Sequence, residues 1–128
     1  MGERHVRAVR GAITVERDEV ELIAAATREL LSTLTARNSL RPEDVISAIF
    51  TVTPDLTSEF PARAARDLGW VDVPLLCAVE IATVNGLPRC IRVLLHVETD
   101  LPREATRHVY LGAARALRPD LRDDREGI

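Results

Sequence analysis

The sequence predicts an α+β domain in which helices pack on one face of a mixed β-sheet. Four segments carry the branched, apolar or alternating residues that are typical of strands, and three others carry apolar residues at helical spacing. Of the 128 residues, 46% are hydrophobic, which suffices for one buried core without disulfides or metals. We therefore expect residues 1–128 to form a single domain.

The chain begins with a predicted strand and a long helix. Residues 6–14 alternate between the two faces of a strand, and Arg10 is a polar residue on one of them. Asp18 begins a capping-box-like pattern, after which leucine and isoleucine recur at helical spacing as far as Asn38. We expect a helix over residues 18–37 that buries its apolar stripe against the sheet.

A helical turn, a second strand and a short helix follow. Residues 41–44 predict the single turn, and residues 45–52 are rich in branched side chains, which favours a central strand. A short amphipathic helix is predicted over residues 60–68. Phe60 and Arg63 lie one turn apart on it, and two interpretations stay open: they line the mouth of a pocket, or the arginine rests its stem on the ring in solvent.

Residues 75–83 and 89–98 predict a third and a fourth strand. Residues 85–86, Asn-Gly, indicate that the two strands form a hairpin. The register decides where Glu80 lies relative to Arg92. A two-residue turn places them on different faces, whereas a three-residue loop or a β-bulge opposes them directly, and we favour the second arrangement.

A last helix is predicted over residues 100–118. Tyr110, Leu117 and Arg118 fall on one stripe of this helix, where a tyrosine usually packs in the core and finds a backbone partner for its hydroxyl. Residues 119–128 are charged and mixed in sign, and we expect them to form a mobile C-terminal tail.

Composition narrows the classes of function. The formal charge of −3 and the 3% of aromatic residues argue against a nucleic-acid surface, and no apolar run approaches the length of a membrane span. The first residues lack the apolar core of a signal segment, so we expect a cytoplasmic protein. Cys77 and Cys90 then stay thiols, and the histidines lack ligand spacing, so we expect no metal site.

Arg92 is the strongest functional candidate in the sequence. It stands in an apolar run, where a guanidinium is costly unless an anion meets it. That anion is either Glu80, in a structural ion pair, or a bound ligand. Together with Arg10 and Tyr110, these side chains suit a small anionic molecule that carries a hydroxyl group.

Several segments resemble the monofunctional, trimeric bacterial chorismate mutases, in the order and spacing of that family. They are Arg10-Gly-Ala, Thr14-Val-Glu-Arg-Asp, Arg41-Pro-Glu-Asp-Val, Thr53-Pro-Asp-Leu, Phe60-Pro-Ala, Cys90-Ile-Arg-Val, Arg107-His-Val-Tyr-Leu and Leu117-Arg-Pro-Asp-Leu. The resemblance implies a chorismate-mutase-like, ferredoxin-like fold that assembles as a trimeric pseudo-α/β-barrel. It also implies the Claisen rearrangement of chorismate to prephenate in phenylalanine and tyrosine biosynthesis, without a cofactor, a metal, a covalent intermediate or a proton transfer.

The same resemblance assigns roles to the polar candidates. Arg92 would stabilise the negative charge that develops on the ether oxygen. Glu80 would accept a hydrogen bond from the ring hydroxyl of the substrate and hold Arg92 in position. Arg10 and Tyr110 would hold the side-chain carboxylate of the substrate.

The remaining site residues would come from a pocket formed between neighbouring subunits of a homotrimer. Phe60, Cys77 and Leu117 would be its walls, and Arg118 would lie near its entrance. Two further positions depart from the family pattern. Arg63 stands where lysine is frequent, which keeps the charge, and Leu76 stands where threonine is common, which removes a hydroxyl.

Two other functions stay open on the same trimeric scaffold. An imine or enamine deaminase would also use an arginine on a strand to hold a carboxylate. A non-catalytic small-acid binding protein would keep Arg10 and Arg63 but would not need Glu80 to face Arg92.

Overall fold

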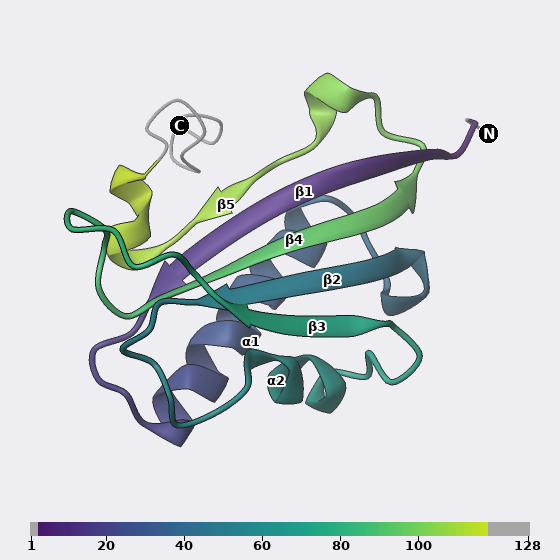
Figure 1. The fold of residues 1–128 in the computed structure, drawn as a ribbon. Coiled ribbons are helices and arrows are strands. Elements are labelled where there is room, and N and C mark those ends of the chain that lie inside the picture. The colour runs from purple at the N-terminus through teal and green to yellow at the C-terminus, as the bar shows by residue number, and fades with distance from the viewer. Residues whose placement is uncertain (1–2, 118–128) are drawn as a thin grey trace.

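The computed structural model describes residues 3–117 and arranges their strands in one mixed sheet (Figure 1). The strands are β1 (His5–Thr14), β2 (Val45–Val52), β3 (Leu75–Val79), β4 (Cys90–Thr99) and β5 (Val109–Tyr110). Their order across the sheet is β3-β2-β4-β1-β5. β4 is antiparallel to both neighbours, whereas β3 is parallel to β2 and β5 is parallel to β1. The central strand is therefore β4, which carries Arg92, and β2 and β1 are the interior strands on either side of it.

Two α-helices cover one face of this sheet (Figure 1). They are α1 (Val20–Arg37) and α2 (Pro61–Asp67), and short 3-10 turns lie at Pro42–Asp44, Arg103–Ala105 and Gly112–Ala116. The α1 leucines Leu30 and Leu34 are fully buried, as are Phe50 and Leu95 on the strands. This apolar layer follows from the helical spacing of the α1 leucines and confirms the predicted α+β class. Within residues 3–117, no helix combines the length and the apolar character needed to cross a membrane.

The alternate residues of the strands point away from the helices and form what we call the open face of the sheet. Its central members are Arg10, Ala12, Ile49, Thr51, Arg92 and Leu94. Arg92, Thr51 and Ile49 are each half-buried in the single chain. Because a strand places successive side chains on opposite faces, Arg92 lies on this face although its sequence neighbours Ile91 and Val93 are buried in the core.

The start of α1 differs from the prediction. The residue that caps the helix is Glu19, and no side chain caps the first turn. The Asp18 carboxylate instead accepts hydrogen bonds from the backbone N–H groups of Thr57 and Ser58, both at 3.0 Å, and from the Thr57 hydroxyl at 2.9 Å. Asp18 therefore holds the loop before α2 instead of capping the helix.

The predicted hairpin of residues 75–83 and 89–98 is wrong. β2 lies between β3 and β4, and β3 ends at Val79. Ile81 and Val84 have strand-forming side chains, but they are 88% and 98% exposed. With no strand beside them, the branched residues beyond β3 stay in a loop, which ends at β4.

The helix predicted over residues 100–118 is also wrong. Tyr110 lies on β5, opposite Ala12 of β1, and the short turns on either side of β5 are of the 3-10 type. Asn38 explains the extended backbone, because its side chain accepts from the Arg107 N–H at 2.7 Å and donates to the Arg107 carbonyl at 2.9 Å. Gly112, with a φ of 62°, then turns the chain at a place that favours glycine.

Candidate active site

The Arg92–Glu80 pair lies on the open face, in the middle of the sheet. Arg92 Nε is 2.7 Å from Glu80 Oε2, and the two side chains are 43% and 16% exposed. The pair forms across β2 rather than across a hairpin, because Thr51 of β2 is the register partner of Arg92. Glu80 follows the end of β3, and its N–H donates to the carbonyl of Val52 at 2.9 Å. The sequence thus predicted the pair of residues correctly but not the strand arrangement that joins them.

Thr51 is a member of this cluster that the sequence prediction missed. Its hydroxyl donates to Glu80 Oε2 at 2.6 Å. The Nε atom of Arg92 is buried, and its N–H is not aligned for a hydrogen bond despite the short distance to the same oxygen. The contact between Arg92 and Glu80 is therefore an ion pair, while Thr51 makes the aligned hydrogen bond. The sequence gives no specific signal for this role, because threonine is common in any strand.

A cavity of about 410 Å³ brings several predicted residues together with Arg92. It is lined by Arg10, Thr51, Arg92, Tyr110 and Leu117, with Gly11, Ile49, Val93 and Leu94. Such a volume fits a small metabolite. The Arg10 side chain is exposed, whereas Tyr110 is 4% exposed and packs against Ala12 and Cys90. Two guanidinium groups and a phenol thus line the same cavity, which suits an anionic ligand.

Arg92 also lines a second cavity, of about 290 Å³. Glu80, Asp55 and Arg92 line it together with the loop at residues 81–88. Asp55 already accepts from the Arg89 N–H at 3.1 and 3.0 Å and from Thr53. Glu80 is therefore the carboxylate of this cavity that is less occupied by backbone donors, and Arg92 lines both cavities.

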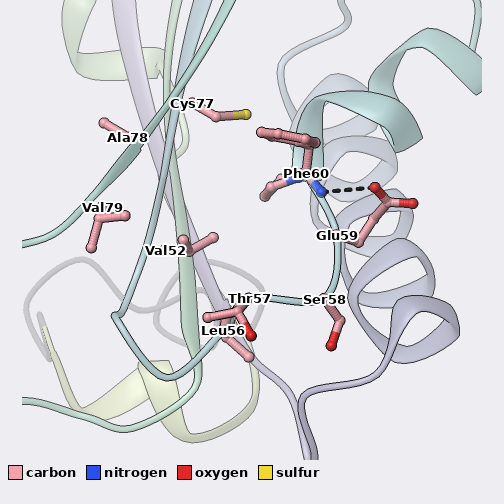
Figure 2. Close-up of a pocket in the computed structure, with 10 residues that line it drawn as sticks. Val52, Leu56, Thr57, Ser58, Glu59, Phe60, Cys77, Ala78 and Val79 are labelled. Atoms are coloured by element: carbon pink, nitrogen blue, oxygen red, sulfur yellow. Dashed lines mark hydrogen bonds between the residues drawn. The ribbon is translucent and has the colours of Figure 1, made fainter.

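Phe60 and Cys77 line a third cavity, of about 300 Å³ (Figure 2). The Cys77 sulfur points toward the Phe60 ring from β3, and Phe60 is 66% exposed (Figure 2). The Phe60 N–H donates to Glu59 Oε1 at 2.9 Å (Figure 2). Cys77 packs on the helix side of the sheet. These two predicted walls are therefore separate from the cavity that Arg92 and Tyr110 share in a single chain.

Three predicted site residues do not line any of these cavities as the structure describes them: Arg63, Leu76 and Arg118. The Arg63 side chain is 64% exposed and pairs with Glu59 at 3.2 Å, and Leu76 is 61% exposed on β3. Neither lines a cavity described above. Arg118 and the predicted mobile tail lie outside the residues that the structure describes. A single chain thus gathers Arg92 and its neighbours but leaves Arg63 and Leu76 facing outward.

The two cysteine thiols of the chain are free, and the thiol of Cys90 is shielded from solvent. Cys90 is fully buried beneath Tyr110, and burial raises the pKa of its thiol to about 11, although the nearby Arg92 guanidinium acts in the opposite direction. A thiol with such a pKa is a weak nucleophile at neutral pH. Cys90 therefore acts as a small core residue.

The fold and the cavity define a class of protein: a mixed-sheet domain whose central strand presents an ion-paired arginine to a cavity of metabolite size. A family model described as chorismate mutase type I matches residues 6–121 of this chain. The chain belongs to the chorismate mutase type I family, and its activity is that of a chorismate mutase, an isomerase.

Individual relatives agree with this family. Chorismate mutase AroH of Bacillus subtilis (strain 168) is 47% identical over 117 residues, which cover 91% of this chain and 92% of the relative. Chorismate mutase AroH of Thermus thermophilus is 54% identical over 117 residues, which cover 91% of this chain and 96% of the relative. A solved chorismate mutase from Clostridium thermocellum has a TM-score of 0.84 and 45% identity, and the match covers 85% of this chain and 97% of that chain. These matches confirm the resemblance and lend no support to the deaminase or the non-catalytic alternative.

Proposed function

We propose that this chain converts chorismate to prephenate on the open face of its sheet, with Arg92 and Glu80 as the catalytic residues. The observation that carries the proposal is the ion pair of 2.7 Å between these residues, presented by the central strand beside a cavity of metabolite size. The reaction breaks a C–O bond and forms a C–C bond within one molecule. Nothing leaves or enters the substrate, so the chain needs no nucleophile, cofactor or metal for this step.

Arg92 would act on the breaking bond. As the ether C–O bond lengthens, its oxygen gains negative charge that the ground state lacks. A guanidinium held at that oxygen stabilises the transition state more than the substrate. Because Glu80 engages the Nε side of the Arg92 guanidinium, the two terminal nitrogens stay available for the substrate.

The other cavity residues would fix the substrate in a reactive conformation. Arg10 and Tyr110 provide a guanidinium and a phenol for the side-chain carboxylate, and Leu117 gives an apolar wall in the same cavity. Glu80 would accept the ring hydroxyl. Holding both ends of the molecule brings the two carbon atoms together and removes much of the entropic cost of the rearrangement.

We further propose a homotrimer whose active sites lie between subunits. The support is that Phe60, Arg63 and Leu76 are each exposed by more than half in the single chain and do not line the cavity of Arg92. An exposed phenylalanine and an exposed leucine are costly in water and are typical of surfaces that another subunit covers. In this arrangement one subunit supplies Arg92 and its neighbour supplies Phe60, Arg63, Leu76 and Cys77.

Prephenate is a precursor of phenylalanine and tyrosine, so the proposed place of the enzyme is aromatic amino acid biosynthesis. We also propose that the protein acts in the cytoplasm, where the small metabolites of such a pathway are available.

The experiment that tests the proposal follows the ultraviolet absorbance of chorismate mixed with the purified protein. Loss of the conjugated diene with saturation kinetics, and no added cofactor, is the expected result. Acid treatment should then convert the product to phenylpyruvate, which identifies it as prephenate. A well-folded protein that leaves the absorbance of chorismate unchanged contradicts the proposal.

A further inference from the structure

Thr51 connects the two proposed catalytic side chains. It lies on β2 between β3 and β4, with Ala78 and Arg92 as its register partners on either side. Its hydroxyl donates to Glu80 Oε2 at 2.6 Å, and the same oxygen is 2.7 Å from Arg92 Nε. One oxygen of the Glu80 carboxylate therefore receives both contacts.

The two contacts constrain Glu80 in different ways. The N–H of Arg92 Nε is not aligned with the carboxylate, so charge attraction sets the distance of the pair but only weakly its direction. Within residues 3–117, the aligned hydrogen bond to the Glu80 side chain comes from Thr51. A threonine in a paired strand has a restricted χ1, so this donor is held in place by the backbone. The direction of the Glu80 carboxylate thus depends on Thr51.

The second oxygen of Glu80 has a different environment. Oε1 accepts no hydrogen bond from the described part of the chain, and the Glu80 side chain keeps 16% of its surface exposed. A ligand hydroxyl can therefore reach Oε1, while Oε2 is occupied by Thr51 and Arg92. Carboxylate oxygens accept hydroxyl donors well when they are held at a fixed angle.

We propose that Thr51 is a positioning residue: it holds Oε2 of Glu80 toward Arg92 and so presents Oε1 to the ring hydroxyl of the substrate. This inference rests on the proposed function of the site. Thr51 itself touches no reacting atom in this arrangement, and its effect on turnover passes through Glu80 and, by the ion pair, through Arg92.

The test compares Thr51→Val with Thr51→Ser in the chorismate assay. Valine keeps the shape and the strand preference of threonine but removes the donor, whereas serine keeps the donor. Loss of this hydrogen bond to a charged group should lower the kcat of Thr51→Val by about tenfold or more, with a smaller change in KM. Thr51→Ser should stay within about threefold of the wild type, because the hydroxyl is restored.

A matched control is Ser47→Ala, which removes a hydroxyl from the same face of β2. Ser47 pairs with His96, at 3.3 Å from its Nδ1, and lies away from Glu80. Its kcat should match the wild type. Where Thr51→Val does not fold, Thr51→Ala gives the same readouts.

A second background separates positioning from a general structural role. If Thr51 acts only through the Glu80 carboxylate, Thr51→Val adds no further loss of kcat to a Glu80→Ala enzyme, because the interaction energy of the pair is already gone. Equal losses in both backgrounds overturn the inference, as does an unchanged kcat in Thr51→Val. Either result leaves the proposed function intact as long as the wild type converts chorismate.

A crystal structure of Thr51→Val provides a readout that does not need turnover. The expected finding is a rotated Glu80 carboxylate whose Oε2 no longer contacts Arg92 Nε. A Glu80 side chain in its original place overturns the inference even in a protein that proves inactive on chorismate.

Discussion

Replacing Arg92 by alanine separates the catalytic role of this residue from its structural one. Arg92 is 43% exposed, and its partner Glu80 keeps the hydrogen bond from Thr51 when the guanidinium is removed. An ion pair whose arginine is this exposed contributes about 1 kcal/mol to the free energy of unfolding. For a domain of this size, such a loss lowers Tm by about 5 °C or less, so the variant should fold.

The expected effect on turnover is much larger. Removing one donor to a charge that develops in the transition state costs about 3 kcal/mol, so kcat should fall by at least about a hundredfold. Arg92→Lys keeps the charge but has no planar fork to serve both Glu80 and the substrate, so it should recover only part of the loss. The assay is the steady-state loss of chorismate absorbance, accompanied by a thermal melt of each variant.

Arg28→Ala is the matched control, because it also removes one positive charge, from an exposed position on α1. Its kcat and Tm should both resemble the wild type. A folded Arg92→Ala enzyme with near-normal kcat would refute the electrostatic role. A Tm that falls by far more than 5 °C, in step with kcat, would indicate that Arg92 supports the fold instead.

Two further predictions concern pH. The turnover number should change little between about pH 6 and 8, because the rearrangement transfers no proton and guanidinium groups do not titrate there; a bell-shaped profile centred near neutrality would contradict this. Hydrogen bonds from Ser58 and Thr57 lower the pKa of Asp18, so its carboxylate stabilises the fold above the unfolded pKa of about 3.9 and stops doing so as the pH falls through the lower folded value. The difference in the free energy of unfolding between wild type and Asp18→Ala, measured by urea unfolding, should therefore close on acidification. Asp72→Ala should show no such difference at neutral or at acidic pH.

Elements with one clear apolar face could be predicted from the sequence. The leucines of α1 recur at helical spacing, and β1 alternates, so each pattern specifies both the element and the face that it buries. Arg92 and Glu80 could be paired for a related reason. A guanidinium in an apolar run is costly unless an anion meets it, and Glu80 was the candidate anion. That argument does not depend on which strands are adjacent, so the pairing of the two residues holds although the predicted hairpin is wrong.

The segment around Tyr110 shows where local patterns mislead. Tyr110 and Leu117 do pack together, as their helical spacing suggested, but they do so from a strand and from the end of a 3-10 turn. What extends the backbone here is the side chain of Asn38, which binds Arg107 from 69 residues away. A partner so distant in sequence leaves no periodic signal, and neither does the Thr51 hydroxyl that meets Glu80.

The proposed division of the site between subunits can be tested by complementation. Arg92 and Arg63 lie apart in one chain, so a site shared between subunits takes Arg92 from one copy and Arg63 from the next. Arg92→Ala and Arg63→Ala homotrimers should each be impaired. When the two variants are co-expressed in equal amounts and assemble at random, about one site in four combines an intact Arg92 with an intact Arg63, so about a quarter of wild-type activity should return. Sites contained within single chains would give no recovery, because every chain carries one of the two substitutions. Homotrimers mixed without subunit exchange serve as the control and should stay as inactive as their parents.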